Sequence, residues 1–80
     1  MDELPRYQPI ACSLHDQIEA AAVRGRLVDI VFARPDDSQE TVNDRIVDWF
    51  SRDGAEFLTT ASGLVVRLDR IISIDGVSFR

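Results

Sequence analysis

The residues of this sequence that are best suited to chemistry lie together in YQPIACSLHDQIE, at positions 7–19. Cys12 is the only cysteine of the chain, and His15 is the only histidine. A thiol at the start of a helix is favoured as the thiolate, and an imidazole three residues later can act as its base. No second histidine is present to orient the pair, and the spacing selects no acid for that role. The pattern therefore favours a buried or half-buried structural cysteine over a nucleophile.

The same two residues make a poor metal site. A structural zinc ion takes four ligands, usually from cysteine and histidine. PDDSQE, at 35–40, contains three acids but lacks the spaced oxygen ligands and the glycine of a calcium-binding loop. The four glycines stand apart, so no glycine-rich phosphate-binding loop is present. We therefore expect no metal, no cofactor and no enzymatic activity.

The charge of the chain indicates a different kind of function. Fourteen acids stand against nine bases, all of them arginine, and the net charge is −5. Such a protein repels nucleic-acid backbones and is attracted to basic surfaces. The alternative is that the charge serves only to keep a small protein soluble.

The length and the N-terminus predict the organisation of the chain. Eighty residues predict one domain, 1–80. Residues 1–9 carry charges and two prolines, which predicts a loosely packed or flexible segment, with Tyr7 and Ile10 as anchors. The N-terminus lacks the apolar core of a signal peptide, and no apolar run approaches the roughly 18 residues of a membrane span. With one cysteine and hence no internal disulfide, we expect a cytoplasmic protein.

One helix is predicted over 14–24. Ser13 and Asp16 fit a capping box, which satisfies free amide groups at a helix start. Gly25 is placed to end the helix in the left-handed conformation. Four apolar residues form one stripe at helical spacing: Leu14, Ile18, Ala21 and Ala22.

After Gly25 the apolar residues follow the two-residue period of strands, starting with Val28, Ile30 and Phe32 on one face. QETVNDRIVDWF, at 39–50, allows three interpretations: a strand that ends near Asp44, a strand re-aimed by a bulge, or a helical turn. Three further strands are expected in AEFLTTA, LVVRL and IISI, with turns at PDDS, SRDG, Ser62-Gly63 and Asp75-Gly76. The fold is thus predicted to be mainly β, with about five short strands bent into a barrel and the N-terminal helix covering one end.

Two kinds of surface are candidates for binding: an acidic helix face for a basic protein partner, and arginine pairs for nucleic acid. Asp16 and Glu19 lie one helical turn apart and off the apolar stripe, where they can attract and orient a basic partner. Tight binding also needs apolar anchors, for which Tyr7 and Trp49 are the candidates. Nucleic-acid binding needs exposed rings beside positive charge. Arg24 with Arg26, or Arg67 with Arg70, would supply the charge, but we expect Phe32 and Phe57 to be core residues.

Three stretches, in order, carry a resemblance to a known family. YQPIxC followed by DQIE resembles the N-terminal signature of the Rho-binding antiterminators, or Rof-like proteins. SRDGAEFL resembles their charged turn and the strand after it, and VRLDRIISI resembles their closing arginine-leucine-aspartate motif. The resemblance extends from Tyr7 to about Ile74.

This resemblance implies an Sm-like (SH3-like) barrel preceded by a helix. It implies a bacterial protein, acting as a monomer, that binds the transcription termination factor Rho at or near the surface where Rho loads RNA. Such a protein inhibits termination without chemistry, and it needs no direct contact with nucleic acid. The alternative is an Sm-like RNA-binding module.

The resemblance also implies individual roles. Asp16 and Glu19 match acidic helix positions, and His15 stands where members of the family often carry a tyrosine. Arg52 matches a charged turn residue, whereas Asp53 and Gly54 depart from the more basic or polar residues expected beside it. The expected partner-binding set, with the helix start included, is Ser13, His15, Asp16, Glu19, Arg52 and Asp53. Arg67 and Asp69 are expected to pair with each other and to serve the fold around the core residue Leu68.

Overall fold

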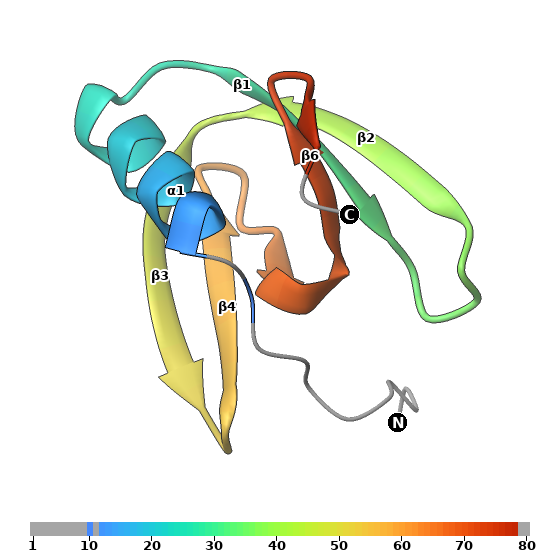
Figure 1. Cartoon of the computed structure of the whole chain (residues 1–80). Coiled ribbons are helices and arrows are strands. Elements are labelled where there is room, and N and C mark those ends of the chain that lie inside the picture. Colours follow the sequence, from blue (N-terminus) through green and yellow to red (C-terminus); the bar gives the residue numbers. More distant parts are fainter. Residues whose placement is uncertain (1–9, 11, 79–80) are drawn as a thin grey trace.

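The computed structural model describes residues 10 and 12–78. One helix precedes seven short strands and one 3-10 turn: α1 (Cys12–Arg24), β1 (Val28–Ala33), β2 (Gln39–Asp44), β3 (Ile46–Arg52), β4 (Ala55–Thr60), β5 (Val65–Arg67), η1 (Leu68–Arg70), β6 (Ile71–Ile74) and β7 (Val77–Ser78). The strands form two antiparallel sheets, in the orders β2-β1-β6-β7 and β3-β4-β5. Figure 1 shows α1 beside β3 and β4, on one side of the curved sheets. The predicted fold, mainly β and barrel-like with one N-terminal helix, is confirmed.

The strand count differs from the five expected because the chain of 39–52 divides and a seventh strand follows β6. β2 ends at Asp44, Arg45 separates the strands, and the register of β3 against β4 shifts between Ile46 and Asp48. This bulge at Val47 places Ile46 and Trp49 on the same face of the sheet. The segment therefore contains both a strand that ends at Asp44 and a bulge, as two of the three interpretations had it. The third interpretation, a helical turn, is wrong.

The helix ends where predicted but begins earlier. Gly25 has a φ of 65°, and its N–H donates to the carbonyl oxygen of Ala21 at 3.0 Å. This bond closes the helix in the left-handed conformation. At the other end, helical backbone extends to Cys12. Ser13 therefore lies inside the first turn and does not hold the predicted cap position, which must precede the helical residues.

One cluster of buried residues joins the helix to both sheets. The helix contributes the predicted stripe of Leu14, Ile18 and Ala21, with the half-buried Ala22 packed against it. Ile10 is also half-buried and packs on this core, as expected of an anchor. From the strands and η1 come Val28, Ile30, Phe32, Ile46, Leu58, Val66, Leu68, Ile71 and Ile74.

The 3-10 turn is fixed by two largely buried arginines. Arg67 and Asp69 form the expected pair, with Nε and Nη2 of the arginine each 2.7 Å from a carboxylate oxygen. Arg70 reaches back to the β1–β2 turn, where Nη2 donates to the carbonyl oxygen of Arg34 and to Oδ1 of Asp37, both at 2.8 Å. Bonds to charged groups are among the stronger hydrogen bonds in proteins, so this turn is a fixed part of the scaffold.

Asp44 ties the end of β2 to the β4–β5 turn. Its Oδ2 accepts hydrogen bonds from the hydroxyl of Ser62 at 2.6 Å and from the N–H of Ser62 at 3.1 Å. Its Oδ1 accepts from the N–H of Arg45 at 2.8 Å. The hydroxyl of Ser62, followed by the N–H of Arg45, lowers the pKa of Asp44 to about 2 from the usual 3.8.

This lowered pKa predicts a specific acid sensitivity. Because the folded state holds Asp44 charged more strongly than the unfolded chain does, its stabilisation is complete above pH 3.8 and is lost as the pH falls towards about 2. Asp44→Asn should melt at a lower temperature near neutral pH but lose less stability between pH 4 and about 2 than the wild type does. Circular dichroism melts across that window measure both effects.

Asp44→Asn should still lose some stability as the pH falls, because other carboxylates are also held charged in the folded state. The pKa of Asp75 is also lowered, mainly by the N–H of Asp29 and by Arg26, and the pKa of Asp36 is lowered by Ser38. Equal pH dependence in Asp44→Asn and the wild type would contradict the role of Asp44.

Candidate partner-binding surface

Asp16 and Glu19 lie on the side of α1 that faces away from the core. Residues two positions apart stand on nearly opposite sides of a helix, and Asp16 is two positions from each of the buried residues Leu14 and Ile18. Asp16 and Glu19 are both exposed, as are Cys12 and Val23, and Val23 is 80% exposed. We call these four residues, Cys12, Asp16, Glu19 and Val23, the outer helix face.

Cys12 is exposed, so the expectation of a buried or half-buried cysteine is wrong. The reason is its position on the helix. Cys12 stands four residues before Asp16 and therefore on the solvent side, whereas Leu14 takes the buried position of that turn.

His15 links the helix to the sheet. Its Nε2 lies 3.3 Å from Oε2 of Glu56 on β4, and both side chains are partly exposed. Glu56 was not among the predicted site residues, because nothing in its local pattern shows that α1 packs over this end of β4. The contact places an additional carboxylate beside the first turns of the acidic helix.

Trp49 flanks the helix on the sheet side. Its cross-strand neighbour is the fully buried Leu58, so the two side chains share the sheet face on which Glu56 meets His15. β3 is an edge strand of its sheet and packs against α1, and Trp49 remains 38% exposed there. The predicted aromatic anchor is thus partly accessible, next to α1. Tyr7, the other candidate, lies outside the described residues.

Arg52 and Asp53 stand at the tip of the β3–β4 hairpin. Asp53 and Gly54 have φ values of 52° and 81°. A two-residue type I′ turn requires such a pair of positive values. An Asp-Gly sequence at this point is therefore explained by the geometry of the turn.

The predicted partner-binding set forms two groups. Both Arg52 and Asp53 are exposed at the hairpin tip, while Asp16 and Glu19 are exposed on the helix. The His15–Glu56 pair joins the helix to the strand that follows the tip. The structure thus links the two groups through β4.

A stacked aromatic pair lies on the other face of the hairpin. The rings of Phe50 and Phe57 are 5.2 Å apart between centroids with 20° between their planes, and the guanidinium carbon of Arg52 lies 5.6 Å from the centroid of Phe50. Phe57 is half-buried, so its assignment to the core is wrong, while Phe32 is a core residue as expected. The reason is the alternation of β4, in which Leu58 takes the inward position.

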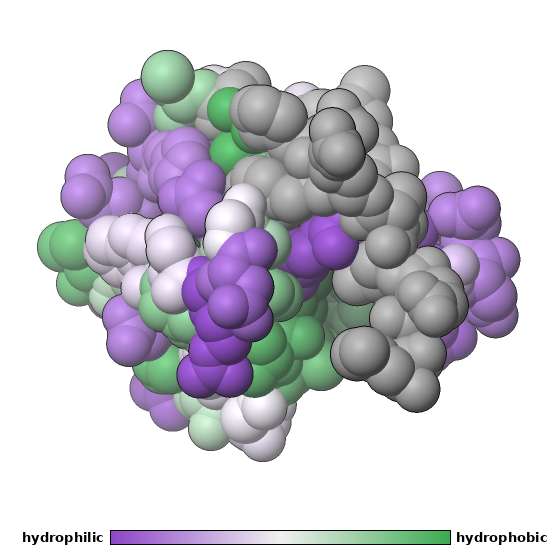
Figure 2. Space-filling model, turned by 90° about the horizontal axis from the view of Figure 1, so that it is seen from below, coloured by the Kyte–Doolittle hydropathy of each residue, from purple (hydrophilic) through white to green (hydrophobic). Residues whose placement is uncertain are grey.

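Viewed from below, the molecule shows hydrophilic and hydrophobic residues side by side (Figure 2). On α1 itself, an open hollow of about 380 Å³ is lined by Ser13, Asp16, Gln17, Ala20 and Arg24. Ser13 and Asp16, two predicted contact residues, therefore border a shallow depression that also includes a basic residue.

The described part of the chain contains no group of three or more His, Cys, Asp or Glu residues arranged to hold a metal ion. In residues 10 and 12–78, no helix has both the length and the apolar character to cross a membrane. No protein-family model matches the chain, and comparison with curated proteins and with solved structures also returns no match.

Proposed function

We propose that this protein binds the transcription termination factor Rho in the bacterial cytoplasm and inhibits Rho-dependent termination without catalysis. The observation that carries the proposal is the placement of Asp16 and Glu19: both are exposed on a helix whose opposite side is locked into the core. These are the two positions at which the sequence resembles the acidic helix of the Rho-binding antiterminators.

The proposed mechanism is competition for a basic surface. A protein that loads RNA must present positive charge, and a domain with a net charge of −5 is attracted to it and repels the RNA that would otherwise bind there. Exposed ion pairs contribute only about 0.2–1 kcal/mol each. Trp49, partly exposed beside the helix, is the group that we assign to supply apolar contact.

The hairpin tip gives a second contact in this proposal. Arg52 is exposed at the tip, and its guanidinium lies over the ring of Phe50. Because the residue is exposed, its guanidinium is available to an acid of the partner. His15 lies on the flank of the helix, where its Nε2 is 3.3 Å from Oε2 of Glu56 and its partly exposed ring can also meet the partner.

A binding measurement with competition tests the proposal. The full chain is immobilised and exposed to purified Rho, with and without single-stranded RNA, and RNA binding to the chain alone is measured separately. We expect capture of Rho, release of Rho by added RNA, and no RNA binding by the chain itself. Capture of Rho that RNA does not reduce would exclude competition, and absence of capture would reject the proposal.

RNA binding is the second candidate, and one observation favours it. Phe50 and Phe57 form a half-buried stack, and the guanidinium of Arg52 lies over Phe50. Proteins that bind single-stranded RNA combine aromatic rings and positive charge in this way. The net charge opposes this function. Saturable RNA binding that is lost in Phe50→Ala, without capture of Rho, would favour this candidate over the first.

A further inference from the structure

A small apolar pocket lies between the β1–β2 turn and β5. Its volume is about 180 Å³. Its apolar lining includes Phe32 and Pro35, from β1 and the β1–β2 turn, and Val65 and Val66, from β5. Pockets for drug-sized ligands occupy about 300–1,000 Å³. This one therefore accommodates a compact group, about the size of one short branched or aromatic body.

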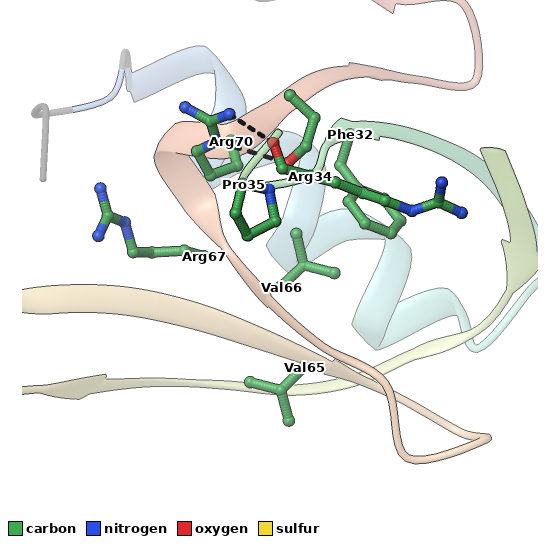
Figure 3. A pocket seen from close by; sticks show the side chains of 8 residues that line it. Phe32, Arg34, Pro35, Val65, Val66, Arg67 and Arg70 are labelled. Atoms are coloured by element: carbon green, nitrogen blue, oxygen red, sulfur yellow. Dashed lines mark hydrogen bonds between the residues drawn. The ribbon is translucent and has the colours of Figure 1, made fainter. Parts of the chain in front are cut away.

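Three of the nine arginines of this acidic chain also line the pocket: Arg34, Arg67 and Arg70. Figure 3 shows their guanidinium groups spread around the apolar residues. Among the described residues that line the pocket there is no acid. Each of the three is paired with a carboxylate just outside the lining, Glu40, Asp69 and Asp37 respectively. The lining therefore combines apolar surface with guanidinium donors whose charge is balanced nearby.

Two of these arginines retain hydrogen-bonding capacity. The bonds that the described residues make with Arg34 use Nε and Nη2, both of which donate to Oε1 of Glu40. Those of Arg70 also use Nε and Nη2, which donate to two carbonyl oxygens of the chain and to Asp37. A guanidinium has five N–H donors, so Nη1 of each arginine remains for another acceptor.

The remaining donors of Arg70 are within reach of solvent. The side chain of Arg70 is only 10% exposed, and its bonds to the β1–β2 turn fix its position. Within residues 10 and 12–78, no buried side-chain nitrogen or oxygen lacks a partner. Nη1 of Arg70, which makes none of the bonds above, is therefore accessible and held in place.

We propose that this pocket binds a small carboxylic acid with a compact apolar body. The apolar lining takes the body, and Nη1 of Arg34 or Arg70 donates to the carboxylate in a charge-assisted bond. The pocket shares no residue with the outer helix face, so this proposal does not rest on the proposed binding to Rho.

The test is an NMR titration of the full ¹⁵N-labelled chain with 3-phenylpropionate, and with 3-phenylpropanamide as its neutral counterpart. We expect saturable shifts of the amide signals of Ala33, Arg34 and Val66 with the acid, and affinity at least tenfold weaker for the amide. Equal affinity for acid and amide, shifts that map to other residues, or no saturation would each overturn the proposal.

A matched pair of variants completes the test. Val65→Glu places a carboxylate in the lining of the pocket, at a residue that is 52% exposed, and should weaken binding of the acid at least tenfold. Val47→Glu is the control: it makes the same change at a valine that also lies on a strand and is similarly exposed (55%) but is not part of the pocket. It should leave binding of the acid unchanged. Equal affinity of the two variants would overturn the assignment of the site.

Discussion

Replacing both Asp16 and Glu19 with arginine is expected to weaken binding to Rho by roughly 10–100-fold while the fold persists. Each lost exposed pair removes about 0.2–1 kcal/mol, and the new like charges add repulsion from the basic surface. The fold should persist because both side chains are exposed and face away from the core. Titration calorimetry with purified Rho gives the affinity, and a thermal melt followed by circular dichroism checks the fold.

The control for this variant changes the net charge by the same amount elsewhere. Asp29→Arg with Asp36→Arg alters exposed residues of β1 and the β1–β2 turn, in the sheet that does not contain β3 and β4. Asp29 accepts a hydrogen bond from Asn43 and Asp36 accepts two from Ser38, so the fold of the control is checked by the same thermal melt. If the outer helix face is the contact surface, the control should lose much less affinity than the helix variant. Similar losses in both would mean that overall charge, not this face, governs the association. No loss in the helix variant would remove Asp16 and Glu19 from the interface.

The dependence on salt gives a second readout from the same proteins. Attraction between exposed charges is screened over a Debye length of about 8 Å at physiological ionic strength. Affinity of the wild type for Rho should therefore fall as salt is raised, and the fall should be shallower in the helix variant. A wild-type affinity that does not change with salt would contradict the electrostatic part of the mechanism.

The largest effect on stability is expected from Ile18→Ala. Ile18 is 1% exposed and lies in the middle of the buried stripe that joins α1 to the strands. Truncation of such a residue costs about 2–5 kcal/mol, because buried methyl groups are lost and a cavity remains. A chain of this length has a total stability of only about 4–12 kcal/mol. Urea unfolding at equilibrium measures the difference, and binding to Rho should decline with the folded fraction.

Val23→Ala on the same helix is the matched control. Val23 is 80% exposed, and alanine is the better helix former. Surface substitutions of this kind change stability by about 0.5 kcal/mol or less. Equal destabilisation by the two substitutions would contradict the assignment of the buried side of α1. Ile18→Ala with wild-type stability would show that the helix does not depend on this contact.

The local pattern of the sequence was sufficient to predict the helix and the first strand, with the side that each buries. The spacing of Leu14, Ile18 and Ala21 predicted the buried side of the helix, and Gly25 predicted its end. Alternation in β1 predicted the burial of Val28, Ile30 and Phe32. These features depend on residues a few positions apart, whose relation is set by the period of the backbone.

The sequence left the bulge in β3 as one of three interpretations and could not choose between them. Alternation along QETVNDRIVDWF is broken, and the sequence does not show whether a bend, a bulge or a helical turn resolves it. The structure places the break at Arg45 and the bulge at Val47, because β3 must pair with β4 while Ile46 stays in the core. As a consequence Trp49 faces the helix side, and Phe50 stacks on Phe57 on the opposite face.

The sequence by itself determined the acidic charge, the helix, the turns and the exposure of Asp16 and Glu19. Tertiary structure decided which distant groups meet: His15 with Glu56, Arg70 with the β1–β2 turn, and three arginines around one apolar pocket. These groups lie far apart along the chain. Their meeting depends on how the sheets curve and where the helix packs, which the periodicity of neighbouring residues does not encode.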